Sequence, residues 1–257
     1  MIERARKNPK ILDEWYRLFE LMFAVVGPCE IAEIAESISP YRITHFVDVG
    51  CGAGDFTCAI QKRCGFHVDA LEPEHYYYEK TLKKFPNKNI KFLNMPLSSY
   101  TTTADCLFFR YVAQHFADKT GLCKDAAGKL CAGGIAVVVE SIACQSNPQI
   151  ESYKTIGRRF LDFYTRGTPK ELENDIVKSF INAGFRLERQ KILHIPIVSA
   201  AAKSAFGEMI YNAGLVKAMS SEQDLTIMEQ MREELQILQT FGATVDCRDI
   251  LLVFQKL

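Results

Sequence analysis

The sequence predicts an α/β protein built on a doubly wound, seven-stranded, mostly parallel sheet. A helix precedes the first strand, and a helical insertion precedes the last one. Two observations lead to this prediction. Short apolar segments of strand length alternate along the chain with helical patterns. A turn with glycines at alternate positions follows the first strand, where an open α/β sheet has its binding crevice.

The first element is a helix with a clear start. Asn8 is a suitable N-cap and Pro9 fits the first helical position, whereas Gly27-Pro28 predicts the end of the helix. Apolar residues recur between these points at helical spacing. The stripe predicts a helix that covers apolar core with one face.

Residues 47–55 (Val-Asp-Val-Gly-Cys-Gly-Ala-Gly-Asp) join strand Thr44–Val49 to helix Phe56–Arg63. Because glycine has no Cβ, such a turn can bend sharply and let a ligand lie against its backbone. The N–H groups at the start of the following helix suit a polar or anionic ligand group. The turn therefore predicts a binding loop formed by Gly50, Gly52 and Gly54.

The glycine spacing distinguishes between ligands. A dinucleotide fingerprint, G-x-G-x-x-G, would need its third glycine at position 55, which is Asp55. The observed G-x-G-x-G, with Asp48 two residues before the first glycine, resembles motif I of the class I S-adenosylmethionine-dependent methyltransferases. This resemblance implies a Rossmann-like fold with S-adenosylmethionine as cofactor and S-adenosylhomocysteine as product. It also makes Cys51 a small spacer in the loop rather than a nucleophile.

A second strand, Val68–Leu71, ends in Glu72, about 20 residues beyond the glycine loop. A nucleotide-binding fold places the carboxylate that binds a ribose at this position. Pro73 stops the strand, so that the carboxylate faces the crevice. A helix (His75–Phe85) and a third strand (Ile90–Leu93) follow.

The third strand is followed by a departure from the family pattern. Methyltransferases of this family often carry an acidic residue there, which binds the adenine amino group, whereas this chain has Asn94-Met95. Asn94 can still accept a hydrogen bond from adenine, and Met95 can pack on the purine face. Both residues are therefore assigned to the cofactor site.

The fourth and fifth strands complete the resemblance, which covers about residues 42–142. After the fourth strand, Asp105–Phe109, the segment Arg110–Phe116 resembles the stretch beside the methionine part of the cofactor, and this assigns Arg110 and Tyr111 to the site. Leu130-Cys131-Ala132-Gly133-Gly134, followed by Ile135–Glu140, resembles the L-x-x-G-G turn into the fifth strand.

The C-terminal part departs from the family pattern. Thr168-Pro169-Lys170-Glu171 is a capping box that predicts a helix to Ala183-Gly184, and Arg186–Ile195 reads as the sixth strand. Before the seventh strand, Asp249–Gln255, about 50 residues intervene where family members have almost none. Helical patterns occupy this insertion at Ala200–Ala213 and Ser221–Phe241.

Three parts follow from these elements. Residues 1–40 form an N-terminal helical lid, residues 41–198 plus 247–257 form the S-adenosylmethionine-binding Rossmann-like domain, and residues 199–246 form the helical insertion. The resemblance implies that the lid folds over the cofactor. The insertion then closes the substrate site or forms a homodimer contact. Expected substrate contacts are Trp15, Tyr16, Phe19, Arg158 and Tyr164.

The implied reaction is direct displacement at the sulfonium methyl group, which depends on holding the acceptor in line. A general base helps where the acceptor is a hydroxyl or a protonated amine. His115, just past the fourth strand, and Glu140, at the end of the fifth, are the candidate catalytic residues. No metal is expected, because neither the paired aspartates of magnesium-dependent catechol enzymes nor clustered histidines and cysteines are apparent.

The composition limits the partners and the compartment. Lys+Arg and Asp+Glu are both 31, and this balance argues against DNA or bulk RNA as substrate. Nine scattered cysteines without a C-x-x-C pair indicate a reducing cytoplasm. No apolar run is long enough for a membrane span, and the N-terminus lacks the layout of a signal peptide.

The sequence therefore predicts a methyltransferase acting on O, N or C of a small-molecule substrate. Alternatives are a protein or RNA methyltransferase, a non-catalytic S-adenosylmethionine-binding regulatory module and an NAD-linked oxidoreductase. The run Phe109-Arg110-Tyr111-Val112 stands where enzymes that methylate amides or adenines carry an Asn/Asp-Pro-Pro-Tyr motif, and so counts against that route. The glycine spacing and the lack of a Tyr-x-x-x-Lys pair oppose the oxidoreductase.

Overall fold

The structure is a computed structural model in which residues 8–86, 89–116, 118–163, 168–238 and 243–257 are described. The chain divides into two compact units. The sheet unit comprises Cys29–Ile142, Gly167–Leu193 and Arg248–Leu257. The helical unit comprises Met1–Pro28, Ala143–Arg166 and His194–Cys247. Residues 143–166, predicted from the sequence to be part of the Rossmann-like domain, are grouped with the helical unit.

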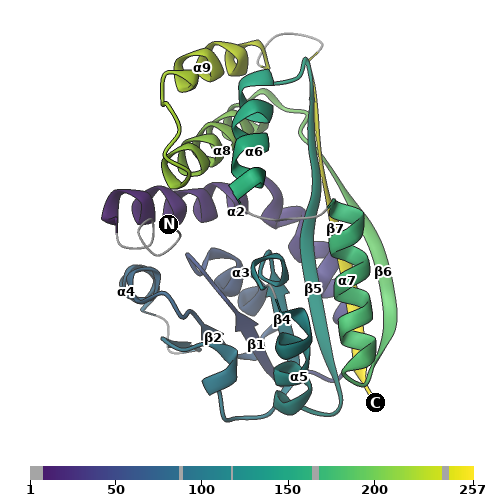
Figure 1. The fold of residues 1–257 in the computed structure, drawn as a ribbon. Helices are drawn as coiled ribbons and strands as arrows, with labels where there is room; N and C mark the ends of the chain where they lie inside the picture. The colour runs from purple at the N-terminus through teal and green to yellow at the C-terminus, as the bar shows by residue number, and fades with distance from the viewer. Residues whose placement is uncertain (1–7, 87–88, 117, 164–167, 239–242) are drawn as a thin grey trace. The chain divides into compact units, whose positions relative to one another are not determined.

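Seven strands form one sheet in the order β3-β2-β1-β4-β5-β7-β6 (Figure 1). Their bounds are β1 His45–Val49, β2 His67–Leu71, β3 Ile90–Leu93, β4 Ala104–Arg110, β5 Leu130–Asn147, β6 Phe185–Pro196 and β7 Thr244–Lys256. The pairs β1–β2, β2–β3, β1–β4 and β4–β5 are parallel. The strand order reverses between β1 and β4, and this switch point is where such sheets bind ligands. The predicted doubly wound fold is confirmed.

The helices alternate with these strands as predicted. Their bounds are α2 Pro9–Ile38, α3 Asp55–Cys64, α4 His75–Lys84, α5 Lys119–Lys129, α6 Glu151–Phe163, α7 Pro169–Asn182, α8 Ala200–Ser220 and α9 Ile227–Ile237, with 3₁₀ turns η1 Leu97–Ser99 and η2 Ala113–His115. The capping box at Thr168 and Glu171 forms at the start of α7. In the sheet unit, α7 packs beside α5 (Figure 1).

The core of the sheet unit explains why its strands read as continuous apolar runs. A parallel sheet is covered on both faces, so its side chains are buried whichever way they point. Phe46 of β1 and Phe108 of β4 are fully buried, and Phe108 stacks on Phe56 of α3 with ring centroids 4.9 Å apart. Phe180 of α7 stacks on Phe254 of β7 at 4.3 Å.

The N-terminal helix begins as predicted but does not end at Gly27-Pro28. Asn8 caps it by accepting a hydrogen bond from the Lys10 amide, and the helix continues through Pro28 to Ile38. A proline inside a helix costs about 3 kcal/mol. Ile34 and Ile38 are fully buried beyond it, and their packing stabilises the continued helix.

The predicted turn at Gly133-Gly134 lies inside β5. Leu130 pairs with Ala104 of β4 and Ile135 pairs with Cys106, so the register shifts between these pairs. Gly133 has a φ of 74°, which interrupts regular pairing without ending the strand. The predicted strand Ile135–Glu140 is therefore the buried middle of a longer element.

The helical unit contains α6, α8 and α9, which pack against one another (Figure 1). Helix α8 runs further than the predicted Ala200–Ala213. Helix α9 begins at Ile227, later than the predicted Ser221, and the predicted end at Phe241 lies outside the described residues. At the contact of α8 with α9, a Cβ on Gly214 would lie 2.7 Å from Cε of Met231. No helix among the described residues is long and apolar enough to cross a membrane.

Candidate cofactor and active site

The glycine loop connects β1 to α3 at the carboxyl edge of the sheet. The amides of Gly50 and Cys51 both donate hydrogen bonds to the Leu71 carbonyl, at 2.8 and 3.0 Å. These bonds tie the loop to the end of β2. Gly50, Gly52 and Gly54 have φ values of 76°, 54° and 75°, in the left-handed region that favours glycine.

Two of these glycines also lie against neighbouring side chains. A Cβ on Gly50 would lie 2.8 Å from Cγ2 of Val112, and one on Gly54 would lie 2.6 Å from Cγ2 of Thr81. Both distances are too short for carbon atoms. The loop is therefore restricted to glycine by its conformation and by its packing.

Asp48 lies directly before the loop and is buried. Its Oδ2 accepts a hydrogen bond from Thr57 Oγ1 of α3 at 2.5 Å. Burial raises the pKa of Asp48 to about 6, although the Thr57 bond and the Arg110 charge oppose the rise. The carboxylate is thus held rigidly beneath the loop.

Glu72 follows β2 and joins the same site. Its Oε2 accepts a hydrogen bond from the Gly52 amide at 2.9 Å, and its Oε1 accepts one from the Glu74 amide at 2.8 Å. Burial raises the pKa of Glu72 to about 7, against the effect of these two bonds. The adjacent Pro73 is exposed. The predicted carboxylate and the predicted glycine loop are therefore in direct contact.

Asn94 and Met95 follow β3 with different roles. Asn94 Nδ2 donates hydrogen bonds to the carbonyls of Glu72 (2.8 Å) and Pro73 (3.2 Å). Asn94 Oδ1 lies 3.1 Å from Nδ1 of His75. The amide therefore holds the turn that carries Glu72. Met95 is half-buried and packs against the core of the sheet unit.

Arg110 and Tyr111, at the end of β4, belong to a buried polar network. The Arg110 guanidinium pairs with Glu30 Oε2 of α2 through two nitrogens, at 2.7 and 2.8 Å. The Tyr111 hydroxyl lies 2.8 Å from Glu30 Oε1 and 2.8 Å from Asp249 Oδ2 of β7. Tyr111 holds this position with a φ of 57°.

One phenolic proton cannot be donated to two carboxylates at once, so the network needs another proton. Burial, followed by the Glu30 charge, raises the pKa of Asp249 to about 7. Glu30 and Asp249 were not identified from the sequence. A helix continued past Pro28 at four-residue spacing would have aligned Glu30 with Ile34 and Ile38 on the buried face.

The two catalytic candidates flank one backbone amide. Glu140 is buried in β5, and its Oε1 accepts a hydrogen bond from the Gln114 amide at 3.1 Å. His115, the next residue in η2, is exposed, and its own amide bonds to the Val112 carbonyl at 2.9 Å. The segment after β4 is thereby fixed to β5, close to the Val112 side chain that contacts the loop at Gly50.

The expected substrate residues belong to the helical unit. Tyr16 is buried, Trp15 and Phe19 are half-buried with ring centroids 6.2 Å apart, and Arg158 is exposed on α6. Tyr164 lies outside the described residues. The helical unit also contains a cavity of about 380 Å³, whose lining includes Glu14, Tyr211, Asn212 and Arg232. Asn212 Nδ2 donates to Glu14 Oε2 at 2.6 Å at its wall.

Part of the chain is similar to a known protein family. The model of a methyltransferase domain matches residues 47–138, from the first strand into the fifth. No curated protein matches the chain.

Solved structures share the fold. A mycolic acid cyclopropane synthase, in complex with SAH and CTAB, has a TM-score of 0.61 at 15% identity, covering 100% of this chain and 98% of that one. The cyclase SpnF has a TM-score of 0.57 at 12% identity, covering 88% and 80%. A phosphoethanolamine N-methyltransferase from Haemonchus contortus has a TM-score of 0.55 at 13% identity, covering 88% and 52%. At these identities the likeness shows a common fold alone.

Proposed function

Residues 47–138 of this chain belong to the class I (Rossmann-like) S-adenosylmethionine-dependent methyltransferases, whose cofactor is S-adenosylmethionine, and we propose that the protein methylates O, N or C of a small-molecule acceptor. The observation that carries the proposal is the 2.9 Å hydrogen bond between the Gly52 amide and Glu72 Oε2. It connects the glycine loop to the carboxylate that a ribose requires, at the switch point of the sheet.

The donor and acceptor groups of the site fit this cofactor. A carboxylate has about four lone-pair sites, and Glu72 uses two of them on backbone amides. The remaining two suit the two ribose hydroxyls. Asp48, buried before Gly50, would attract the ammonium group of the methionine part, and the loop without Cβ atoms would let it lie close.

The contacts of Asn94 change the part it is proposed to play in adenine binding. Because the Asn94 side chain is engaged with the turn at residues 72 and 73, it acts first as a support for Glu72. Its remaining acceptor capacity, on Oδ1 next to His75, is what the adenine amino group would use. Arg110 and Tyr111 likewise act through the backbone after β4, since their side chains hold Glu30.

When bound, the cofactor supplies an electrophilic methyl group. The protein then has to orient the acceptor and remove its proton where it has one. Glu140 and His115 are the groups proposed for the proton, because Glu140 Oε1 accepts a hydrogen bond from the Gln114 amide and His115 is the next residue in η2, just after β4. Trp15, Tyr16, Phe19, Arg158 and Tyr164 remain the proposed acceptor contacts.

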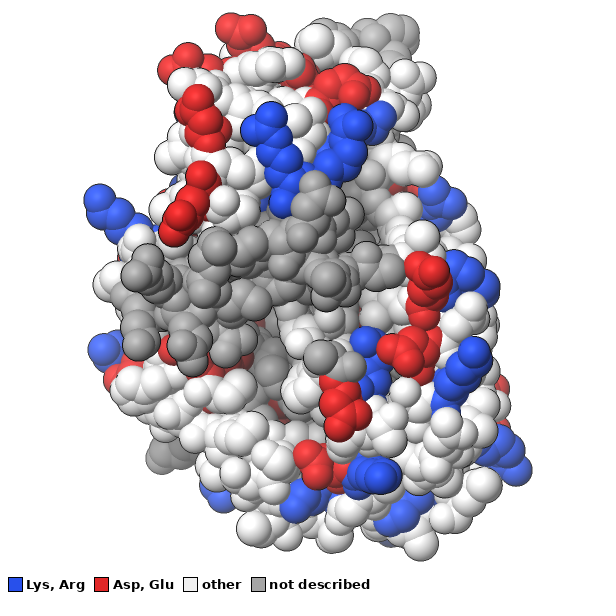
Figure 2. Space-filling model, in the orientation of Figure 1, with Lys and Arg blue, Asp and Glu red and all other residues white. Residues whose placement is uncertain are grey.

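A small acceptor is favoured over a nucleic acid by the charge distribution. Lysine and arginine are balanced by aspartate and glutamate in the chain, and both signs occur together over the face drawn in Figure 2. Phosphate binding normally uses a basic surface. A protein or RNA substrate and a non-catalytic binding role remain alternatives that the experiment below separates.

The proposed location is the cytoplasm, and the proposed assembly is a homodimer. No disulfide joins any of the nine cysteines, all of which lie in the described ranges, and this supports the proposed reducing cytoplasm. A homodimer through the insertion at residues 199–246 would bury apolar side chains such as Leu225 and Ile237, which are about half exposed.

The test is a screen for S-adenosylhomocysteine release from S-adenosylmethionine with pooled small hydroxyl, amine and carboxylate acceptors, and with RNA and protein extracts in parallel. We expect turnover with a small-molecule pool that is lost in Glu72→Ala and kept in Glu79→Gln, a surface change on α4. Turnover with the RNA or protein extract alone would show that the acceptor is a macromolecule and not a small molecule. Cofactor binding without turnover in any pool would favour the non-catalytic role.

A further inference from the structure

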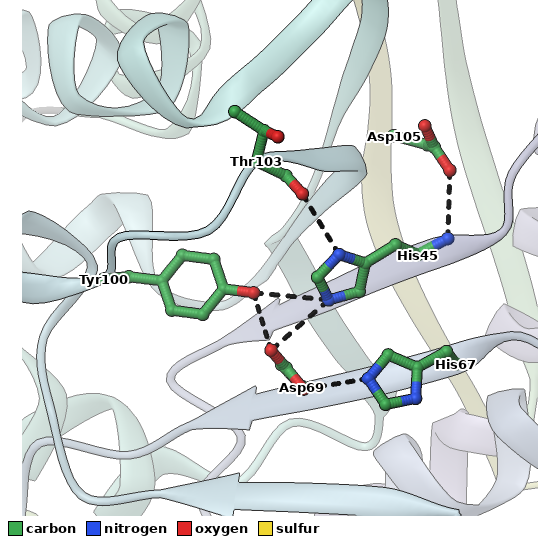
Figure 3. Close-up of polar contacts among 6 residues, drawn as sticks. All are labelled: His45, His67, Asp69, Tyr100, Thr103 and Asp105. Carbon is green, nitrogen blue, oxygen red and sulfur yellow. Dashed lines mark hydrogen bonds and ion pairs between the residues drawn. The ribbon is translucent and has the colours of Figure 1, made fainter.

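Three side chains with metal-binding atoms meet at the amino-terminal edge of the sheet, at the opposite end of the strands from the glycine loop. His45 is the first residue of β1 and pairs in register with His67, the first residue of β2. Asp69 lies two residues after His67, on the same face of β2. Figure 3 shows the three side chains converging. We call them the His45–His67–Asp69 cluster.

The distances within the cluster suit a small cation. His45 Nε2 lies 3.3 Å from Asp69 Oδ2, and His67 Nε2 lies 3.3 Å from Asp69 Oδ1. One ligand atom from each of the three residues lies within 4.8 Å of the other two. Neighbouring ligands of a tetrahedral zinc ion are roughly 3.3–3.5 Å apart, given zinc–nitrogen and zinc–oxygen bonds of about 2.0–2.2 Å.

The Asp69 carboxylate is buried, and its Oδ1 contacts His67 Nε2 at 3.3 Å without accepting a hydrogen bond. Oδ2 accepts a hydrogen bond from the Tyr100 hydroxyl at 2.6 Å. Among the described residues, no hydrogen bond reaches Oδ1, although Asp69 is only 4% exposed. A buried acceptor without a donor costs free energy, and a bound cation would remove that cost.

His45 is held in the orientation that a ligand needs. Its Nδ1 lies 3.1 Å from the Thr103 carbonyl, which can only accept, so Nδ1 carries the proton there. Its Nε2 faces Asp69 Oδ2 at 3.3 Å and the Tyr100 hydroxyl at 3.2 Å (Figure 3). Backbone carbonyls commonly orient metal-binding histidines in this way. His67 is 60% exposed at its side chain, and its Nε2 faces Asp69 Oδ1 at 3.3 Å.

From this arrangement we propose that the His45–His67–Asp69 cluster is a binding site for a transition-metal dication of the zinc type. Two imidazoles and one carboxylate form the donor set that zinc accepts, with water as the fourth ligand on the exposed side of His67. The ion joins the start of β1 to the start of β2. It lies a whole strand away from the cofactor loop, since β1 runs from His45 to Val49 before Gly50.

The role of such an ion is structural and not part of methyl transfer. The same strand β1 carries Asp48 and leads into the glycine loop. Fixing its first residue to β2 would stabilise the pair of strands that position Asp48 and Glu72. No metal was expected from the sequence, because His67 lies 22 positions after His45 and the strand register alone brings the two together.

The experiment is isothermal titration of the chelator-treated full chain with zinc chloride, followed by thermal unfolding with and without zinc. We expect one site with a Kd in the micromolar range, and a rise in melting temperature with zinc. His67→Asn should weaken binding by at least tenfold and abolish the rise. This variant is expected to fold normally, because the side chain is exposed. His45→Gln provides a second test.

Two controls separate the cluster from other zinc ligands in the chain. His194→Asn removes an exposed histidine on β6 and should leave binding unchanged. Cobalt(II) reports the ligand type, because thiolates give an intense near-ultraviolet charge-transfer band and a nitrogen and oxygen site does not. Absence of binding, or binding that survives His67→Asn and His45→Gln, would overturn the proposal. So would a cobalt spectrum dominated by thiolate bands, which would assign the ion to cysteines.

Discussion

The Glu72 carboxylate accepts a hydrogen bond from the Gly52 amide at 2.9 Å, so the ends of β1 and β2 share one polar contact at the switch point of the sheet. Residues 20 positions apart in the sequence are brought together by the parallel register of two short strands. This contact fixes both the loop conformation and the direction of the carboxylate. It is the structural basis of the proposed cofactor site.

The ionisation of Glu72 predicts a pH-dependent affinity for the cofactor. Burial raises the pKa of Glu72 to about 7, and only the ionised carboxylate accepts from both ribose hydroxyls. Affinity for S-adenosylhomocysteine should therefore increase up to about tenfold from pH 6 to pH 8. Glu72→Gln should bind more weakly at pH 8 and lose the pH dependence, whereas Glu79→Gln should retain both. An unchanged pH profile in Glu72→Gln would show that the ionisation of Glu72 does not control cofactor affinity.

Replacement of Gly50 tests the packing of the loop. Gly50→Ala places a Cβ 2.8 Å from Val112 in a backbone with a φ of 76°, whereas Gly65→Ala has the same φ and open space around the Cβ. The second change should cost about 1 kcal/mol of unfolding free energy from the backbone alone. Gly50→Ala should cost at least about 1 kcal/mol more and weaken cofactor binding. Urea unfolding of both variants checks this, and equal losses would contradict the packing argument.

The buried network around Tyr111 predicts how stability depends on pH. The pKa of Asp249 is raised in the folded state to about 7, so the folded protein holds a proton that the unfolded chain releases above pH 4. The contribution of this proton is fully present below about pH 4 and is lost as pH rises toward 7. Stability should fall across this window by up to about 1.4 kcal/mol per pH unit from this residue.

Asp249→Asn should reduce that decline, because an amide does not titrate. Asp48 and Glu72 have pKa values raised in the same direction, so part of the decline remains. Asp175→Asn, which changes an exposed carboxylate paired with Lys119, is the matched control and should leave the decline intact. Denaturant unfolding between pH 4 and 8 measures the decline in unfolding free energy. The same slope in Asp249→Asn and in the unmodified protein would show that Asp249 holds no extra proton.

The proposed proton acceptor predicts a selective loss of turnover. Glu140→Gln keeps an oxygen for the Gln114 amide but removes the basic carboxylate. With the acceptor found in the screen, kcat should fall by about 10²- to 10⁴-fold, while the cofactor Kd changes less than about twofold. His115→Asn is the parallel test for the other candidate. Full activity in both variants would show that neither residue is the general base.

Much of the cofactor site could be predicted from the sequence because its signals are local. The strand before Gly50, the three glycines and the carboxylate after β2 each follow from a few consecutive residues, and the structure contains all of them. The parallel order of the strands then brings Glu72 to Gly52. The role of Asn94 in adenine binding stays a prediction; its side chain holds the Glu72 turn, which a sequence pattern does not reveal.

The features that could not be predicted from the sequence depend on contacts between distant segments of the chain. The helix that passes Pro28 is stabilised by the burial of Ile34 and Ile38, whereas the local signal predicted an end at the proline. Glu30 and Asp249 meet at Tyr111 although they lie at opposite ends of the chain. The His45–His67–Asp69 cluster depends on strand register, which places two isolated histidines side by side.

The most direct test of the account is isothermal titration of the purified chain with S-adenosylmethionine, S-adenosylhomocysteine and NAD⁺. We expect micromolar binding of the first two, with loss of binding in Glu72→Ala and in Asp48→Ala and no binding of NAD⁺. Circular dichroism of both variants confirms that they are folded. Binding of NAD⁺ in place of the sulfonium cofactor, or binding of S-adenosylmethionine that is unchanged in both variants, would contradict it.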